Sequence, residues 1–460
     1  MVAKMTALPD LAPQVRFFQE GSMRPVEARL VVLKRLEQTF SDRREDVLQA
    51  LADDLGKAEL EAFLSEFYFV LTEIRLFRKK LKGWLRPRRA STPIYYQPAK
   101  SWSQLEPLGQ SLIYSPWNYP IQLALAPLVA SVAAGNTVVL KPSELAPASA
   151  AFLEKLVQDV FDPDHVTVVQ GDAEVSEKLL DLPFDHVFFT GSTEVGRSVY
   201  QKAAKQLIPC VLELGGKCPC VVDGTFDLQV TAQRILFGKL FNGGQTCFAP
   251  DFVAVAADVH DDLLKALERE LEAHPWEKEL ARIISPRHYK RLQNILRLTS
   301  ISSTTEFYQK SENRPDDLYQ GPRLLFNNHW DSPAMEEEIF GPILPLVPYQ
   351  SEDELFENLP LEGKPLALYV FSEKKEFVAK LTARVPSGSV GWNDVSKQAS
   401  NLDLPFGGVG ASGFGRYRGK FGLEEFSNLR AYTKRPAWGN FMTPTPPYDK
   451  MTEMLKKFLK

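Results

Sequence analysis

The chain has 460 residues, of which 24% are charged and 44% hydrophobic, and its formal net charge is −4. This composition is typical of a soluble globular protein, and the weak negative charge gives no reason to expect nucleic acid as a partner. A chain of this length is too long for one hydrophobic core, so we expect two or three domains.

The cysteine content and the absence of apolar runs indicate a reducing compartment. The four cysteines are too few for a disulfide framework in so long a chain. Cys218-Pro-Cys220 lacks the two-residue spacing of common zinc or redox motifs, so no metal site is expected. The N-terminus has no charged segment followed by an apolar core, and no stretch of about 18 apolar residues predicts a membrane span. These features predict a cytoplasmic protein.

The first half of the chain predicts helices, then an extended arm, then alternating strands and helices. Residues 25–80 have helical apolar spacing, with Gly56 as a stop, and the proline-rich and aromatic stretch 86–106 predicts the arm. Strands are expected at 111–114, 137–141, 166–170, 186–190 and 210–214, and helices between them at 127–134, 148–160, 173–180 and 193–206. This alternation predicts a parallel, doubly wound sheet, which binds ligands beyond the carboxyl ends of its strands.

A second α/β set is expected in the remaining chain. Its strands are predicted at 252–256, 367–371 and 389–393, with a helix at 262–273 and a glycine-rich loop at 405–415. The predicted fold class is therefore α/β, with a Rossmann-like cofactor domain, an α/β catalytic domain and a small extended oligomerisation arm. The expected limits are 1–85 and 106–213 for the dinucleotide-binding domain, 214–424 for the catalytic domain, and 86–105 and 425–460 for the arm and C-terminal tail.

Cys247 is a candidate nucleophile. It lies in Phe-Asn-Gly-Gly-Gln-Thr-Cys-Phe-Ala-Pro at 241–250, after a run with helical apolar spacing. Gly243 and Gly244 break that spacing, as they do where backbone passes close to a ligand. A thiol placed this way can act as a nucleophile once it loses its proton, and the alternative is a buried, inert cysteine. No histidine lies within ten residues of Cys247, so local sequence does not support a Cys–His pair.

Three other motifs, besides that of Glu213, carry chemistry, and each has a plainer alternative. Gly191 and Ser192 lead from a strand into a helix, where free N–H groups and the helix dipole favour a phosphate, although such a turn is often only a cap. Lys141 and Glu144 follow another strand and can bind ribose hydroxyls, or simply mark the strand end. Asn118, between Trp117 and Tyr119, can donate to an oxyanion or hold its own turn.

Glu213 lies within an apolar strand, two residues before a double glycine. Burial raises the pKa of a carboxyl group and makes it a plausible general base. The alternative is a glutamate that pairs with a buried arginine or lysine.

Seven segments, taken in order, resemble the NAD(P)-dependent aldehyde dehydrogenase superfamily from about residue 20 to about residue 450. They are Ser-Pro-Trp-Asn-Tyr-Pro at 115–120, Leu-Lys-Pro-Ser-Glu at 140–144, Phe-Thr-Gly-Ser-Thr-Glu-Val-Gly at 189–196, Glu-Leu-Gly-Gly-Lys at 213–217, Gly-Gln-Thr-Cys at 244–247, Glu-Glu-Ile-Phe-Gly-Pro at 337–342 and Pro-Phe-Gly-Gly-Val-Gly at 405–410. Trp-Asn-Tyr-Pro, Cys-Phe-Ala-Pro-Asp at 247–251 and Lys-Pro-Leu-Ala-Leu-Tyr-Val-Phe-Ser at 364–372 are similar to the class 3 branch. That branch favours medium-chain, fatty and aromatic aldehydes and forms dimers.

The resemblance implies oxidation of an aldehyde to a carboxylic acid, with hydride transfer to NAD(P), through a cysteine thiohemiacetal and a thioester hydrolysed by water. It implies Cys247 as the nucleophile, and Asn118 with the N–H of Cys247 as the oxyanion hole. Glu213 is implied as the base that activates water, a role that Glu338 could share. A small-molecule aldehyde is the expected partner, and a homodimer the expected assembly.

The resemblance also assigns cofactor and substrate contacts. The residues matched to NAD(P) contacts, or to the turn that carries them, are Lys141, Glu144, Gly191, Ser192, Thr193, Glu194, Val195, Gly196, Glu338 and Phe340. Glu144 would repel a 2′-phosphate, which favours NAD over NADP. The residues expected in the substrate pocket are Tyr119, Thr246, Trp392 and Phe406, and the bulk of Trp392 is expected to shorten the substrate tunnel.

The sequence departs from the family pattern at two positions, and two other functions are alternatives to aldehyde oxidation by water-dependent hydrolysis. Ala411 stands where the class 3 pattern usually has Asn, and Gly243 replaces the usual Ala, which affects the expected substrate size more than the chemistry. A CoA-acylating or acyl-phosphate-forming enzyme needs no water-activating base, so Glu213 argues against both. A non-enzymatic cofactor-binding protein is disfavoured because Cys247, Asn118 and Glu213 are all present.

Overall fold

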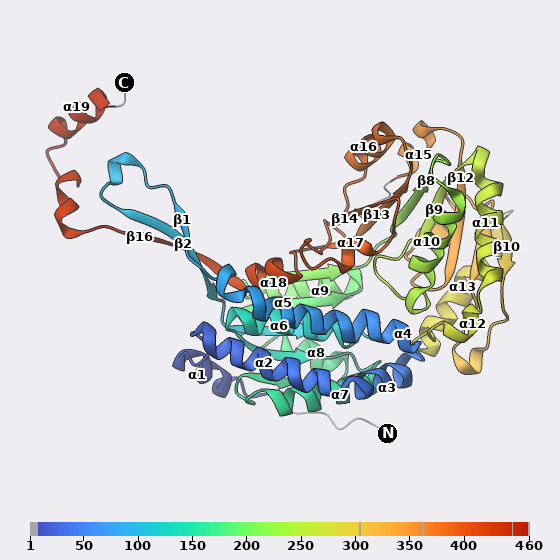
Figure 1. The fold of residues 1–460 in the computed structure, drawn as a ribbon, viewed down its shortest axis with the longest axis horizontal. Helices are drawn as coiled ribbons and strands as arrows, with labels where there is room; N and C mark the ends of the chain where they lie inside the picture. Colours follow the sequence, from blue (N-terminus) through green and yellow to red (C-terminus); the bar gives the residue numbers. More distant parts are fainter. Residues whose placement is uncertain (1–7, 303–304, 360–362, 444, 459–460) are drawn as a thin grey trace.

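The computed structural model describes residues 8–302, 305–359, 363–443 and 445–458. They form two α/β units and an arm that projects away from both (Figure 1). The parts of the predicted domains at 1–7, 303–304, 360–362, 444 and 459–460 lie outside the described residues.

The first unit is built on a six-stranded sheet with the order β15-β7-β6-β3-β4-β5. Its strands are β3 (Gln110–Tyr114), β4 (Thr137–Lys141), β5 (Val166–Val168), β6 (His186–Gly191), β7 (Cys210–Leu214) and β15 (Gly413–Phe414). All neighbours are parallel except β15, which pairs antiparallel with β7. The chain winds outward from β3 through β4 and β5, then returns to the other side of β3 for β6 and β7. The predicted doubly wound α/β fold is confirmed, with its change of winding direction between β3 and β6.

Helices cover both faces of this sheet. They are α1 (Ala12–Glu20), α2 (Val26–Asp42), α3 (Arg44–Leu55), α4 (Glu59–Ala62), the π-helix η1 (Phe63–Tyr68), α5 (Phe69–Trp84), α6 (Gln122–Ala134), α7 (Pro147–Val160), α8 (Ala173–Leu179), α9 (Thr193–Lys205) and α18 (Gly419–Glu425). Every residue of α6 is buried, because α5, α18 and α2 all pack on it. The sequence predicted that this helix would start at Pro127, but it starts at Gln122, where the carboxylate of Glu66 accepts the N–H groups of Ile121 and Gln122.

The second unit carries a seven-stranded sheet with the order β10-β11-β12-β9-β8-β13-β14. Its strands are β8 (Pro219–Val222), β9 (Phe252–Ala256), β10 (Glu306–Gln309), β11 (Arg323–Phe326), β12 (Ile343–Tyr349), β13 (Ala367–Phe371) and β14 (Ser389–Trp392). The helices around it include α10 (Leu228–Leu240), α11 (His260–Ala273), α13 (Pro286–Ser302), α14 (Pro333–Glu336), α15 (Glu352–Asn358), α16 (Lys375–Arg384) and α17 (Lys397–Ser400). Of these strands, β8, β10, β11 and β12 were not predicted from the sequence.

The arm is a three-stranded sheet with a C-terminal extension (Figure 1). Its strands are β1 (Arg88–Ala90), β2 (Lys100–Pro107) and β16 (Ser427–Lys434), followed by η6 (Ala437–Met442) and α19 (Asp449–Phe458). β2 pairs with β16 along its whole length, and the rings of Trp102 and Tyr432 stack across the pair at 5.1 Å. The other edge of β16 has no neighbouring strand among the described residues.

The helices and the domain boundaries bear on two predictions from the sequence. None of the described helices is both long and apolar enough to cross a membrane. Residues 413–414 lie within the predicted catalytic domain, yet they form β15 of the first sheet. The predicted domain limits stay a prediction.

Candidate active site

Cys247 lies in a turn between α10 and β9, just after a tightly bent segment. Gly243 and Gly244 have φ angles of +62° and +75°, in the left-handed region that favours glycine. A Cβ atom on Gly244 would lie 2.3 Å from the carbonyl oxygen of Gly341. The two glycines therefore allow the chain to pass close to Gly341 and to turn so that Cys247 is half-buried.

The surroundings of Cys247 favour the protonated thiol over the thiolate. Burial raises the pKa of the Cys247 thiol, the carboxyl groups of Glu338 and Glu213 raise it further, and the guanidinium of Arg418 opposes them. Because the thiolate is the nucleophilic form, a thiol in this setting needs a proton acceptor or a nearby positive charge to react.

Asn118 is bonded directly to the segment that carries Cys247. Its Nδ2 donates to the carbonyl oxygen of Gln245 at 2.9 Å, and the carbonyl oxygen of Asn118 accepts from Nδ2 of Asn242 at 2.9 Å. The loop after β3 and the turn before β9 are thus joined by hydrogen bonds in both directions. An amide nitrogen carries two N–H groups, so Asn118 retains one that can serve an oxyanion.

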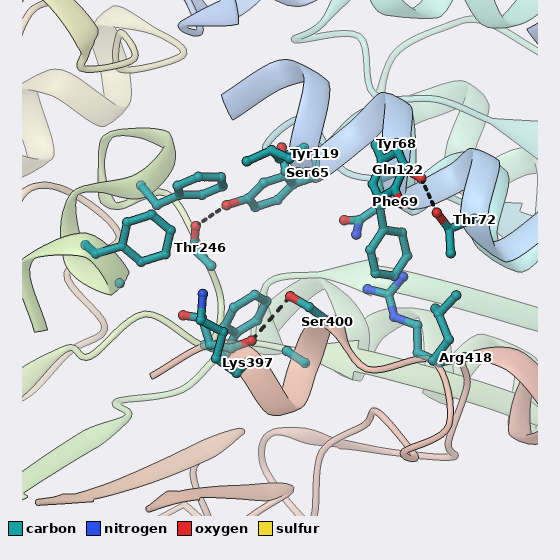
Figure 2. A pocket seen from close by; sticks show the side chains of 18 residues that line it. Ser65, Tyr68, Phe69, Thr72, Tyr119, Gln122, Thr246, Lys397, Ser400 and Arg418 are labelled. Carbon is teal, nitrogen blue, oxygen red and sulfur yellow. Dashed lines mark hydrogen bonds between the residues drawn. The ribbon is translucent and has the colours of Figure 1, made fainter. Parts of the chain in front are cut away.

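A cavity of about 310 Å³ lies beside these two loops. Tyr119 and Thr246 form part of its wall, with 2.6 Å between the phenol oxygen and Oγ1 (Figure 2). The aromatic side chains that line it are Tyr68, Phe69, Tyr119, Phe237, Phe241 and Phe248. Because Thr246 and Phe248 flank Cys247 in the chain, the cavity extends to the loop that carries the thiol.

Glu213 is buried in β7, opposite Gly413 of β15. Neither of its carboxylate oxygens has a hydrogen-bond partner among the described residues. Burial raises its pKa well above the ordinary value, while the guanidinium groups of Arg418 and Arg416 lower it. A carboxylate with a raised pKa is a stronger base than an ordinary glutamate, and one with unused acceptor atoms is suited to take a proton from water.

Glu338 is a second carboxyl group near Cys247, and its residue is half-buried. Its side chain lies against Gly215, where a Cβ atom would come within 2.1 Å of its Oε2. Burial and the nearby Asp251 carboxylate raise the pKa of Glu338 to about 8, against the lowering effect of the Gly216 N–H and of Lys217. Phe340, two residues on, has a φ of +51° and sets its ring edge-on to Trp117 at 5.4 Å.

Lys141 and Glu144 lie together at the carboxyl end of β4. The Lys141 ammonium group is buried, donates to the carbonyl oxygen of Pro142 at 2.9 Å, and lies 3.4 Å from the Glu144 carboxylate. Burial lowers the pKa of Lys141, and Glu144 opposes this shift. A donor and an acceptor held at a strand end fit the two kinds of hydrogen bond that a ribose hydroxyl can make.

The segment Gly191–Gly196 leads from β6 into α9. Ser192 is the N-cap, and its Oγ accepts the N–H of Val195 at 3.4 Å. Thr193 donates to the carbonyl oxygen of Ala411 at 3.3 Å, and Glu194 and Val195 are exposed. A Cβ atom on Gly196 would lie 2.5 Å from Leu214, so glycine lets α9 pack close to β7. These residues fit a dinucleotide, which the N–H groups at the start of α9 would hold through its phosphates.

Two residues expected in the substrate pocket do not line the cavity. Trp392 is 47% exposed, and its indole N–H donates to the carbonyl oxygen of Ser372 at 2.8 Å. Phe406 is buried, with its ring 5.8 Å from that of Phe248. Their roles in substrate binding, and a tunnel shortened by Trp392, stay predictions.

Three residues of the site were not found by reasoning from the sequence. Lys57 and Glu66 form a buried ion pair beneath the Asn118 loop, and Arg418 lines the cavity. Lys57 and Glu66 lie in stretches that predict ordinary helices, so nothing marked them as buried. The available signal for Arg418 was a basic residue three positions after the glycine-rich loop 405–415. No group of three His, Cys, Asp or Glu side chains suited to a metal ion occurs in the described part of the chain.

The fold and the site define an α/β protein with a dinucleotide-type sheet, a cysteine between two residues of a cavity wall and a buried carboxyl group near that cysteine. The model of the aldehyde dehydrogenase family matches residues 15–432, and the chain belongs to this family. It is an NAD(P)-dependent aldehyde dehydrogenase that oxidises an aldehyde to a carboxylic acid, as predicted from the sequence.

Similar proteins confirm the predicted class 3 branch. The chain is 40% identical to the 4,4'-diaponeurosporen-aldehyde dehydrogenase of Staphylococcus aureus, over 96% of this chain and 97% of that protein. It is 39% identical to aldehyde dehydrogenase family 3 member H1 of Arabidopsis thaliana, over 96% and 93% of the two chains. The solved structure of Staphylococcus aureus AldH in a substrate-bound state is 38% identical, with a TM-score of 0.92 over 97% of this chain and 98% of that one.

Proposed function

We propose that Cys247, Asn118 and Glu213 carry out the oxidation, and that the substrates are medium-chain, fatty or aromatic aldehydes. The observation that supports this most is the joining of the Asn118 loop to the Cys247 turn, next to an aromatic cavity and a buried carboxyl group with unused oxygens. The names of the similar family 3 proteins agree with an aldehyde substrate.

In this mechanism the thiolate sulfur of Cys247 adds to the carbonyl carbon of the aldehyde. The oxyanion that forms accepts hydrogen bonds from Nδ2 of Asn118 and from the N–H of Cys247. The bound nicotinamide supplies the acceptor for the hydride that leaves this carbon, and a thioester on Cys247 remains. Water then attacks the thioester while Glu213 takes its proton, the carbon–sulfur bond breaks, and the acid leaves.

We infer that Glu338 and Phe340 hold the nicotinamide end of the cofactor and that Lys141, Glu144 and the start of α9 hold the adenosine end. The carboxylate of Glu144 beside Lys141 would repel a 2′-phosphate, which supports NAD as the preferred cofactor. Four free cysteines agree with a reducing compartment such as the cytoplasm.

The test of the mechanism is Glu213→Gln, which keeps the shape of the side chain but removes the base. Acylation does not need this base, so a burst of reduced cofactor near one equivalent per site should appear before turnover stalls. General-base help is worth about 10²–10⁴ in rate, so steady turnover should fall by that factor. Mass spectrometry of the stalled protein should find the acyl group on Cys247.

The matched variant Glu338→Gln separates the two carboxyl groups. It should alter the cofactor KM and leave thioester hydrolysis in place. Steady turnover in Glu213→Gln together with a stalled acyl-enzyme in Glu338→Gln would transfer the base role to Glu338. Loss of the burst in Glu213→Gln would place Glu213 before hydride transfer, as the group that deprotonates the thiol.

We also propose that the protein is a homodimer that uses the arm. The edge of β16 that faces away from β2 has no partner strand in the described part of the chain, and most β16 residues are exposed. An open strand edge favours pairing with another chain. Light scattering at micromolar concentration should give the mass of two chains. Lys or Pro substitutions of exposed β16 residues such as Leu429, which is 55% exposed, should then shift the mass towards one chain. A monomeric wild type would contradict this proposal.

A further inference from the structure

Arg418 is a buried cation on the cavity wall whose hydrogen-bonding groups are largely unused. Its exposed fraction is 2%, and Nε and Nη1 are buried with no hydrogen-bond partner in the described part of the chain. Nη1 lies 3.9 Å from Oε2 of Glu73, beyond hydrogen-bond distance. Burial of N–H groups on a charged side chain is unfavourable unless an acceptor reaches them.

Aromatic rings fix the guanidinium group of Arg418 in this position. Its Cζ lies 4.3 Å from the ring centre of Phe69, 4.5 Å from that of Tyr417 and 5.2 Å from that of Phe406. Figure 2 shows the group below Phe69, on the side of the cavity away from Thr246. Rings stabilise the faces of a guanidinium, whereas its N–H groups point outward from its edge. The group is thus held in place at the cavity wall, and its Nε and Nη1 have no acceptor among the described residues.

The backbone also holds Arg418 in an unusual conformation. Its φ angle is +89°, which lies in the region that favours glycine and is unfavourable for a long side chain. Such conformations persist where surrounding contacts impose them, and they are concentrated at ligand sites.

Among the described residues, the charged side chains that line the cavity are both positive. Arg418 and Lys397 are the charged residues of its lining, and neither an aspartate nor a glutamate is among the lining residues. Lys397 is exposed, with its ammonium group 5.1 Å from the ring centre of Phe237. A substrate that enters therefore meets one cation near solvent, aromatic walls, and a second cation inside.

We propose that the cavity selects aldehydes that also carry a carboxylate, and that Arg418 binds this carboxylate. A guanidinium presents its N–H groups as a rigid fork that matches the two oxygens of a carboxylate. The substrate class is that of oxo-carboxylates, in which one end is oxidised at Cys247 while the other is held. The inference rests on the proposed function, because the same cavity must deliver the aldehyde carbon to Cys247.

The test compares matched substrates that differ in this group alone. The first pair is para-carboxybenzaldehyde and para-methylbenzaldehyde, and a series of ω-oxo carboxylates with alkanals of equal length follows. The readout is the ratio of kcat/KM for the carboxylate to that for the neutral aldehyde. Arg418 also lowers the pKa of the Cys247 thiol. This effect changes the rate with both substrates alike, so it cancels in the ratio.

Wild type should prefer the carboxylate. Arg418→Met should lower the ratio by roughly 10- to 100-fold, the loss expected when a charged hydrogen-bonding partner is removed. Arg418→Lys keeps the charge without the fork and should retain part of the preference. Lys420→Met removes an exposed cation two residues away, outside the cavity lining, and should leave the ratio unchanged.

Several outcomes would overturn the inference. An equal ratio in wild type and Arg418→Met would refute the role of Arg418. A wild type that oxidises neutral aldehydes and prefers no carboxylate would also refute the inference, but it would leave the proposed function intact. A wild type that oxidises no aldehyde would refute the proposed function itself. If Arg418→Met fails to fold, competitive inhibition of wild type decides: terephthalate should inhibit more strongly than para-toluate, and equal inhibition would refute the binding of a second carboxylate.

Discussion

Lys57→Met tests how the oxyanion donor is positioned. Lys57 and Glu66 are fully buried and form an ion pair. Nζ of Lys57 also donates to the carbonyl oxygen of Asn118 at 3.3 Å, while Glu66 accepts the N–H groups of Ile121 and Gln122 at 2.9 and 3.1 Å. The pair therefore fixes the backbone on both sides of the Asn118–Tyr119 step.

The expected loss of stability follows from these contacts. Removal of one partner from a buried ion pair typically costs about 3–5 kcal/mol, because the other charge stays buried. Glu66 keeps its two backbone N–H donors, so we expect the lower end of this range for Lys57→Met. The loosened Asn118 should also lower kcat by roughly 10- to 100-fold. This loss is smaller than the roughly 10²–10³ expected when an oxyanion donor is removed altogether, because the amide group is still present.

Urea unfolding and steady-state kinetics measure the two effects, and a double variant separates them. Lys57→Met with Glu66→Gln removes both charges and should recover much of the stability, yet kcat should stay low because Asn118 still lacks the hydrogen bond from Lys57. Lys80→Met, an exposed lysine on α5, is the control for loss of a positive charge. A Lys57→Met enzyme with wild-type kcat would refute the positioning role, and a stability change below about 1 kcal/mol would refute the buried-pair argument.

Two further predictions concern Asn118 and the buried histidines. Asn118→Ala should lower kcat by roughly 10²–10³ with little change in KM, and a change confined to KM would assign Asn118 to substrate binding instead. Burial lowers the pKa of His165 and His186 from 6.5 to about 4, so between these values the unfolded chain binds more protons. The unfolding free energy should therefore fall as pH drops from about 6.5 to about 4, by up to about 3 kcal/mol per histidine. Urea unfolding across this pH range should show His186→Asn losing its share of the slope, and an unchanged slope would contradict the assignment.

The sequence predicted the first sheet well because its strands are short apolar runs between clear helices. All five parallel strands of that sheet fall where alternation placed them. The strand β12 was missed because it contains Pro345 and Pro348, and proline argues against a central strand. The structure nevertheless pairs Pro345 with Leu325 and Pro348 with Val255, between two neighbours.

The candidate site was predictable where chemistry is carried by short motifs. Cys247, Asn118 and Glu213 each lie in such a motif, and the structure joins the loops of the first two. Lys57, Glu66 and Arg418 were not predictable, because their importance lies in burial and in partners distant in the chain. Periodicity shows which face of a helix is apolar. It does not show that a charged side chain is buried and contacts a loop distant in the chain.

The antiparallel pairing of β15 with β7 has a consequence for the order in which the protein is made. When Glu213 leaves the ribosome, one edge of its strand has no neighbouring strand. The residues that pair with this edge, Gly413 and Phe414, are synthesised only after most of the second unit. The wall of the cavity is completed later still, by Arg418. A premature stop before these residues would thus leave an incomplete site, however well either unit folds. Enzymatic activity accordingly reports that synthesis has passed residue 418, and it can be used to time that event in a translation extract.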